Sequence, residues 1–452
     1  MIRFILALGL FFLSSPLFAA EPGWKAGFGA AKITPTKPMW MSGYSSRTGP
    51  AEGTEIDLWA KAAVLQPASG KPLVLVTLDL VGIDRETAFQ ITDIIVERDR
   101  LPRGNVAISV SHTHCGPVVG KNLRSMYFFD EAQGKLVDAY TEALPQLVMK
   151  AVNAAYASLE PMSLSWATGT SGFAVNRREN KEADVPMIRE QGMLKGPVDH
   201  DVPVLAARDT KGKLKGVVFG YACHATVMSY MKWSGDYPGF AMLDVEKANP
   251  GAVAMFFAGC GADQNPLPRR DVELAKKYGK QLADSVDAVL AKPMASLSAE
   301  TAAAYREIAL PLKEVPTREE FIKQAAGTDK NVAARAKLLL KQLDAGKEIP
   351  ATYPYPIQTW RLGTDLSLVA LGGEVVVDYS LRLKKDLGGN LWVMGYANDV
   401  MAYIPSARVL KEGGYEGASS MIYYGLPSVW GEKVEDLIVD EVTKQVKLTR
   451  GK

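Results

Sequence analysis

The residues of this sequence best suited to chemistry are two histidines spaced two apart, His112 and His114, within residues 109–117. Residues 105–108 predict a buried strand that Gly116-Pro117 ends, so both imidazoles lie where a strand gives way to a loop. Side chains two apart on a strand share a face, so both rings can reach one ion or one substrate atom. The pair suits metal-assisted hydrolysis, although the short pattern taken alone favours two histidines in a polar turn.

A third histidine and a carboxylate also follow predicted strands. Residues 217–222 predict an apolar strand that leads to His224, which repeats the placement of the first pair. Residues 366–371 predict another apolar strand, followed by two glycines and Glu374, before a helix predicted from 375 to 387. Glu374 is therefore either a further ligand or an ordinary carboxylate at a helix start, where the helix dipole favours negative charge.

Two polar turns offer further candidates. Asp236 stands just before a predicted helix, either as an N-cap or as a carboxylate that orients a group of the site. The predicted strand at 253–257 breaks into a loop in which Gly261 lets the backbone approach a ligand closely. In the same loop, Gln264 and Asn265 could offer hydrogen bonds to a carbonyl or its oxyanion, although a simple tight turn would use the same residues.

Two tyrosines and one buried aspartate have open roles. Tyr403 and Tyr415 lie in polar, glycine-containing loops, where a phenol can bind metal or substrate but more often only packs. Asp79 is the single carboxylate in the apolar run 73–81 and needs a partner, because burying it unpaired costs several kcal/mol. Its partner is either a histidine of the site or an arginine or backbone amide.

The composition is that of a globular protein with a large core. Of the 452 residues, 47% are hydrophobic and 23% are charged. The net charge is +2 with no cluster of Lys and Arg, so we expect no nucleic-acid partner. The three cysteines are too few for a disulfide framework, so we expect buried thiols.

Residues 1–20 have the layout of a signal peptide. Arg3 precedes an apolar run from 4 to 13, and Ala19-Ala20 precedes the polar Glu21. The apolar run is short for a membrane span. We therefore expect cleavage after Ala19 or Ala20 and a mature protein that is periplasmic or secreted.

Strands and helices alternate along the rest of the chain. Apolar strands are predicted at 24–35, 57–65, 73–81, 203–207, 217–222 and 253–257, with a closing strand near Val446. Helices are predicted at 85–99, 136–159, 272–290 and 318–343. We expect an α/β fold in which residues 21–452 form a single large domain, with a mixed β-sheet core flanked by helices and a helical insertion at about 318–346.

Taken in order, these motifs resemble the neutral (alkaline, non-lysosomal) ceramidase family, zinc amidases that split the N-acyl bond of ceramide. The likeness rests on Gly43-Tyr44, His112-Thr113-His114, Asn176-Arg177, the strand into His224, Ser234-Gly235-Asp236, the Gly261 loop, Gly373-Glu374, Tyr403 and Tyr415-Glu416-Gly417. An ordered series of this kind is far more specific than a bare H-x-H. The resemblance implies a zinc-hydrolase domain over most of the mature chain, without the C-terminal immunoglobulin-like domain that family members add.

The resemblance also implies roles for the candidate residues. The ligands of Zn²⁺ would be His112, His224, Glu374 and Tyr403. The catalytic groups near metal and substrate would be His114, Arg177, Tyr415, Asn265 and Asp236, with Gly261 and Gln264 as substrate-binding residues. Zinc-activated water would attack the amide carbon and, with ceramide as substrate, release a sphingoid base and a fatty acid.

The loop at 261–266 departs from the family pattern Gly-Asp-x-Ser-Pro-Asn, whose serine was once regarded as a nucleophile. It reads GADQNP here, so attack by zinc-activated water survives and a serine nucleophile does not. The alternatives are a hydrolase of the same scaffold that acts on another amide, ester or sugar derivative, and a non-catalytic zinc-binding homologue. The expected partner is a small molecule or lipid, with peripheral membrane contact left open and no oligomeric state predicted.

Overall fold

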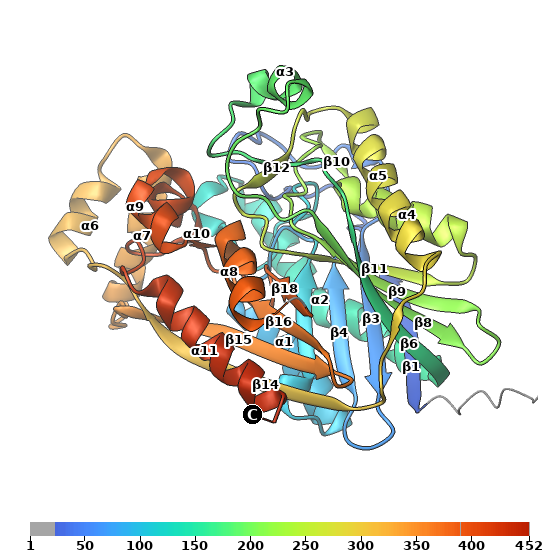
Figure 1. Cartoon of the computed structure of the whole chain (residues 1–452). Coiled ribbons are helices and arrows are strands. Elements are labelled where there is room, and N and C mark those ends of the chain that lie inside the picture. The colour runs from blue at the N-terminus through green and yellow to red at the C-terminus, as the bar shows by residue number, and fades with distance from the viewer. Residues whose placement is uncertain (1–22, 389, 452) are drawn as a thin grey trace, which may run out of the picture.

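Two β-sheets lie face to face between two sets of helices, giving four layers (Figure 1). The structure is a computed structural model that describes residues 23–388 and 390–451. The predicted signal peptide, residues 1–20, lies outside the described residues. The predicted α/β class with a mixed sheet core flanked by helices is confirmed.

The larger sheet has nine strands in the order β11-β9-β8-β6-β1-β3-β4-β5, with β13 paired to β6. Its strands are β1 (Trp24–Lys32), β3 (Trp59–Gln66), β4 (Leu73–Leu78), β5 (Val106–Val110), β6 (Glu160–Thr170), β8 (Asp201–Asp209), β9 (Leu214–Tyr221), β11 (Val253–Ala258) and β13 (Ala295–Ser296). The pairs β4–β5 and β9–β11 are parallel, and the other pairs are antiparallel. The sheet is therefore mixed.

The smaller sheet has the order β14-β15-β16-β18, from β14 (Thr301–Pro311), β15 (Thr352–Leu362), β16 (Leu366–Leu371) and β18 (Leu391–Met394). One of its faces packs on the larger sheet, where Trp360 and Trp392 share a buried cluster with Phe28 and Leu75. Its other face is covered by α8 (Val377–Leu387) and α11 (Val434–Thr449). These contacts place the smaller sheet between the larger sheet and the C-terminal helices.

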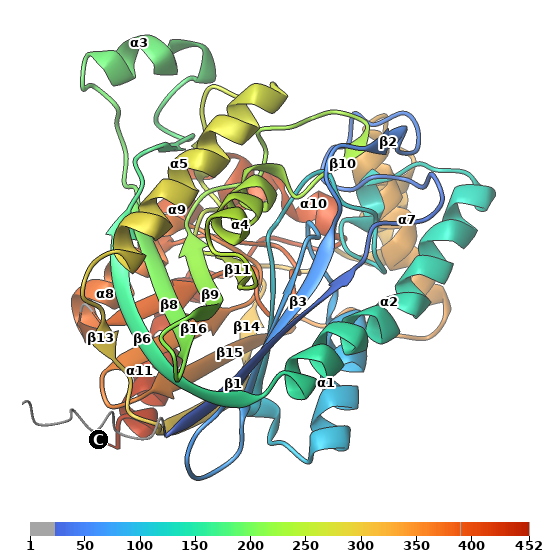
Figure 2. The ribbon, with the colours of Figure 1, turned by 90° about the vertical axis from the view of Figure 1, so that its right-hand side faces the viewer.

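Four helices cover the outer face of the larger sheet, namely α1 (Arg85–Asp99), α2 (Glu131–Ala157), α4 (Asp236–Ala248) and α5 (Val272–Leu290). Figure 2 shows α2 running beside β1 and β3, which it contacts. Strand β1 alternates large and small residues, so Trp24 and Phe28 face the smaller sheet whereas Gly27 and Gly29 face α2. A Cβ at Gly29 would lie 2.2 Å from the carbonyl oxygen of Ala151, so these glycines let the helix backbone touch the strand.

Two predicted elements differ from the structure. The helix predicted at 318–343 is divided into α6 (Arg318–Ala325) and α7 (Lys330–Asp344), because Gly327 follows the first helix and Asp329 caps the second. Whether this pair is an insertion stays a prediction. The closing strand predicted near Val446 is wrong, since that residue lies in α11, where Val434, Ile438, Val442 and Val446 are buried at a helical spacing of four.

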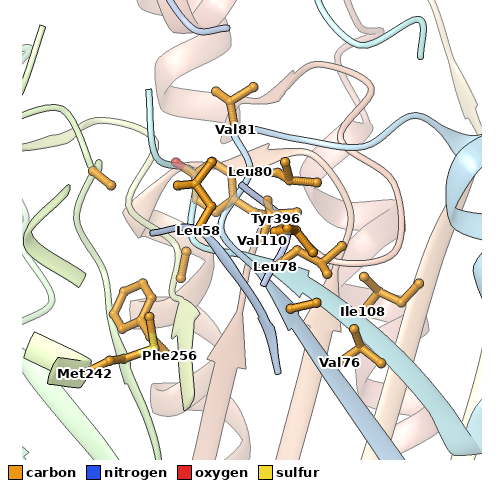
Figure 3. Close-up of a cluster of buried hydrophobic side chains, with 14 of the residues drawn as sticks. Leu58, Val76, Leu78, Leu80, Val81, Ile108, Val110, Met242, Phe256 and Tyr396 are labelled. Atoms are coloured by element: carbon orange, nitrogen blue, oxygen red, sulfur yellow. The ribbon is translucent and has the colours of Figure 1, made fainter. Parts of the chain in front are cut away.

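A cluster of buried apolar side chains surrounds Tyr396. Figure 3 shows Tyr396, which follows β18, among Leu58, Leu80, Val81 and Val110, which come from strand ends and loops of the larger sheet. The three cysteines are buried free thiols, as predicted. Among the described residues, no helix has both the length and the apolar character needed to cross a membrane.

The carboxyl ends of three parallel strand pairs meet where the two sheets join. Isolated β-bridges link Ser109 to Ala397 and Gly259 to Met394, just beyond or at the ends of β5, β11 and β18. The loops that leave these ends carry the predicted histidines and Glu374. Loops at the carboxyl ends of parallel strands are the usual place for ligand sites in α/β folds.

We predict that Gly29→Ala lowers the free energy of unfolding by about 1–3 kcal/mol, because the added methyl group overlaps the α2 backbone. Denaturant unfolding followed by circular dichroism measures this as a lower midpoint. Gly172→Ala is the matched control, since a Cβ there meets no atom within 4 Å. Equal midpoints for the two variants would contradict this account of the strand.

Candidate metal centre

His112 is oriented by its backbone and by one hydrogen bond. It stands two residues after β5 with φ 58°, a left-handed conformation that is uncommon outside glycine. Its Nδ1 lies 2.5 Å from the carbonyl oxygen of Val81. Because a carbonyl only accepts, Nδ1 donates this hydrogen bond, and Nε2 is the ring nitrogen that faces the other groups of the cluster.

His224 is oriented in the same way from the second parallel pair. It follows β9, and its Nδ1 donates to the carbonyl oxygen of Gly261 at 2.8 Å. Burial, aided by the charge of Arg177, lowers the pKa of His224 to about 4, so its imidazole is neutral near pH 7. Its Nε2 therefore presents a lone pair at the position that Nε2 of His112 also faces.

Glu374 completes this arrangement from the chain segment that follows β16 of the smaller sheet. It lies in β17 (Glu374–Val375), and its Oε2 is 3.1 Å from Nε2 of both His112 and His224. Burial raises the pKa of Glu374, but the two histidines outweigh burial and hold it well below its usual range. Oε2 has no hydrogen-bond partner among the described residues. The Nε2 atoms of two imidazoles and a carboxylate oxygen thus converge, and these are donor atoms that a divalent metal ion binds.

Tyr403 and Arg177 complete the inner shell. Tyr403 opens β19 (Tyr403–Ile404), which pairs with β17 so that Glu374 and Tyr403 are register partners. Its Oη lies 3.2 Å from Nε2 of His224 and accepts from Nη2 of Arg177 at 3.1 Å. The guanidinium is fixed in turn by Nε of Arg177, which donates to Glu416 at 2.7 Å. The structure therefore brings together all four predicted ligands.

His114 lies beside this group. Its Nε2 is 3.2 Å from Nε2 of His112, and one ligand atom from each of His112, His114 and His224 lies within 4.8 Å of the others. The three imidazoles could hold a metal ion themselves. The ring of His114 packs against Gly43 and Tyr44, and a Cβ at Gly43 would lie 2.5 Å from it.

A cavity of about 640 Å³ opens onto the cluster, and its lining includes His114, Arg177, His224, Asn265, Tyr403 and Tyr415. Nη1 of Arg177 donates to Oδ1 of Asn265 at 3.3 Å. Tyr415 is 43% exposed at the rim, and its ring centroid is 5.2 Å from that of Tyr403. Four of the five predicted catalytic residues thus face this cavity.

Three of the predicted catalytic and substrate-binding residues are not in the cavity lining, namely Gly261, Gln264 and Asp236. Gly261 holds His224 through its carbonyl, and Gln264 donates to Ala222 at 2.5 Å. Asp236 is fully buried and accepts from the backbone amides of Val227 and Met228. The structure shows backbone contacts for these residues, and their predicted substrate-binding and catalytic roles stay predictions.

Other contacts were open or missed in the sequence. Asp79 accepts from the backbone amide of Trp59 at 2.9 Å, which is the backbone alternative. Tyr424, in α10 (Met421–Tyr424), donates to Oε1 of Glu374. The sequence does not indicate this contact, because Glu374 lies 50 residues away from Tyr424 along the chain.

Comparison with known proteins gives the class. The family model described as neutral/alkaline non-lysosomal ceramidase, N-terminal, matches residues 24–263. That match covers more than half of the chain, and its class is that of hydrolases acting on an amide bond. The chain belongs to the neutral/alkaline non-lysosomal ceramidase family.

Two solved structures share the fold. A neutral ceramidase from Pseudomonas aeruginosa has a TM-score of 0.73 at 20% sequence identity, with 95% of this chain and 75% of that chain covered. A ceramidase complexed with C2 has a TM-score of 0.72 at 20% identity, with the same coverage. A search of curated proteins finds no match.

We predict that Tyr424→Phe weakens binding of Zn²⁺ by about tenfold, because Glu374 loses the phenol that orients its carboxylate. Competition with a chromophoric chelator measures the affinity without any substrate. Tyr423→Phe is the control, since its hydroxyl makes no hydrogen bond to a described residue. Equal affinities of the two variants would show that this bond does not orient the ligand.

Proposed function

We propose that this chain is an exported, zinc-dependent amidohydrolase that cleaves the N-acyl bond of ceramide-type substrates. The observation that carries the proposal is the convergence of two imidazole Nε2 atoms on one carboxylate oxygen, 3.1 Å from each, which has no hydrogen-bond partner among the described residues. Membership of the ceramidase family supports the reaction class. The neighbour complexed with C2 supports ceramide as the first substrate to test. The signal-peptide layout of residues 1–20 supports export to the periplasm or the medium.

The donor set fits zinc. His112, His224, Glu374 and Tyr403 would hold the ion, since imidazole nitrogen and carboxylate oxygen are preferred zinc ligands. The carbonyls of Val81 and Gly261 fix both rings, as zinc-binding histidines require. Zinc bound there would lower the pKa of a water to about 7 and polarise the amide carbonyl.

The chain's own residues would bind the amide and move its protons. Burial and the neighbouring His112 hold the pKa of His114 well below its usual value, so its imidazole is neutral and can accept a proton from water. Passing that proton to the amine completes cleavage of the C–N bond. Arg177, backed by Glu416 and adjoining Asn265, presents a fixed positive charge to the developing oxyanion.

Tyr415 would cover the substrate at the rim. Its ring lies beside Tyr403 and over the guanidinium of Arg177, 5.6 Å from Cζ to the ring centroid. The loop at 261–266 supplies no serine, so water is the nucleophile in this proposal.

We predict that His112→Ala removes both bound zinc and activity, whereas His114→Ala retains zinc and lowers kcat by about a hundredfold. Elemental analysis and steady-state kinetics separate the two effects. His200→Ala is the control, because this fourth histidine bonds the carbonyl of Ala174 outside the cluster. Loss of zinc with His114→Ala, and none with His112→Ala, would reverse the assignment.

The proposal is tested with purified mature protein and a fluorescent short-chain ceramide. We expect release of fatty acid with about one zinc per chain, and loss of activity after chelation that added zinc restores. Stoichiometric zinc without turnover would show that the scaffold is shared with ceramidases and the substrate is not.

A further inference from the structure

The cavity beside the cluster has few apolar side chains. Among the described residues that line it, Leu267 is the one aliphatic side chain, and it is only 1% exposed. The other apolar surface comes from tyrosine rings such as Tyr44 and Tyr415, which carry hydroxyls. A long acyl chain in this cavity would therefore lie against polar groups.

All three arginines of the wall are already paired with glutamates. Arg178 bonds Glu412 and Glu416 at 2.9 and 2.6 Å, and Arg269 bonds Glu182 at 3.0 Å. The lining holds three arginines and four glutamates, so it has little net charge to attract an ion. Paired charges still accept and donate hydrogen bonds to neutral hydroxyls, whereas covering them with hydrocarbon removes their solvation.

One hydroxyl of the wall has no partner. Thr226 lines the cavity and is 2% exposed, and its Oγ1 makes no hydrogen bond to any described residue. Such a buried group is unfavourable unless a ligand or water satisfies it. It therefore indicates a hydrogen-bonding ligand beside the histidines.

We propose that the preferred substrates are N-acylated amines that are neutral and rich in hydroxyls, such as acylated amino sugars or amino polyols, with a short acyl group. This inference rests on the amide hydrolysis of the proposed function, and it gives the preferred substrate a shorter acyl group and a more polar amine than a long-chain ceramide has. The scissile amide faces the histidines, and the hydroxyls bond the paired charges and Thr226. Hydrolysis adds water across the C–N bond and yields a short carboxylic acid and the free amine.

The dependence of binding on the length of the acyl group distinguishes a polar cavity wall from an apolar one. Each methylene buried against an apolar wall strengthens binding about fourfold, so octanoyl, with about six more methylenes, would exceed acetyl by roughly four thousandfold. A wall of charged and hydroxyl groups gives no such gain. We expect N-acetylglucosamine to exceed N-octanoylglucosamine by about tenfold in kcat/KM, because the longer chain covers solvated groups.

The test uses zinc-loaded mature protein with N-acetyl-, N-hexanoyl- and N-octanoylglucosamine. Amine release is followed with a fluorogenic amine reagent, and binding by calorimetry. A rise of kcat/KM or affinity with chain length, or no binding of the acetyl compound, overturns the inference. Binding that favours acetyl without hydrolysis of any N-acyl compound, ceramide included, supports the inference on the wall and overturns the proposed function.

A matched pair of variants tests the hydroxyl. Thr226→Val is expected to weaken binding of N-acetylglucosamine about tenfold and to leave bound zinc unchanged. Thr92→Val is the control, since Thr92 is also buried with an unpartnered hydroxyl but lies in α1, outside the cavity lining. Equal effects of the two changes on binding would show that the hydroxyl of Thr226 does not contact the ligand.

Discussion

The site depends on two hydrogen bonds from imidazole Nδ1 atoms to backbone carbonyls. The carbonyls of Val81 and Gly261 each accept a hydrogen bond from the Nδ1 atom of one ring. The Nε2 atoms of both rings therefore point at one carboxylate oxygen of Glu374. If either ring turned over, a proton would enter the contact and the three groups would form an ordinary hydrogen-bonded cluster. The left-handed backbone at His112 and the buried turn at Asp236 are parts of the same rigid surround.

The two-sheet architecture explains why these groups can meet. The histidines follow strands of the larger sheet, whereas Glu374 and Tyr403 lie in the separate pair of strands β17 and β19, which follow β16 and β18 of the smaller sheet in the chain. Bridges between Ser109 and Ala397, and between Gly259 and Met394, fix the sheets together at this point. The remaining contacts follow from this junction, including the bond from Tyr424 and the ion pair of Arg177 with Glu416.

Strand ends made the inner shell predictable. An apolar run followed by a histidine marked His112 and His224, and the ordered family resemblance added Glu374 and Tyr403. The sequence did not show which way polar side chains point in a glycine-rich loop. Gln264 was predicted to bind substrate, and the structure shows its side chain bonded to the backbone carbonyl of Ala222. Helix α11 was missed near Val446 because a short valine-rich window has no clear period, whereas the whole helix buries every fourth residue.

Because the donors come from two distant parts of the chain, metal binding at this site would mark complete folding. The segment 24–263 that carries the family match contains both histidines, but the carboxylate and the phenol arrive with residues 374–403. A chain whose C-terminal third has not docked would hold only part of the donor set. Zinc would then bind the folded chain more tightly than the partly folded one. Its binding would therefore stabilise the junction between the sheets that creates the zinc site.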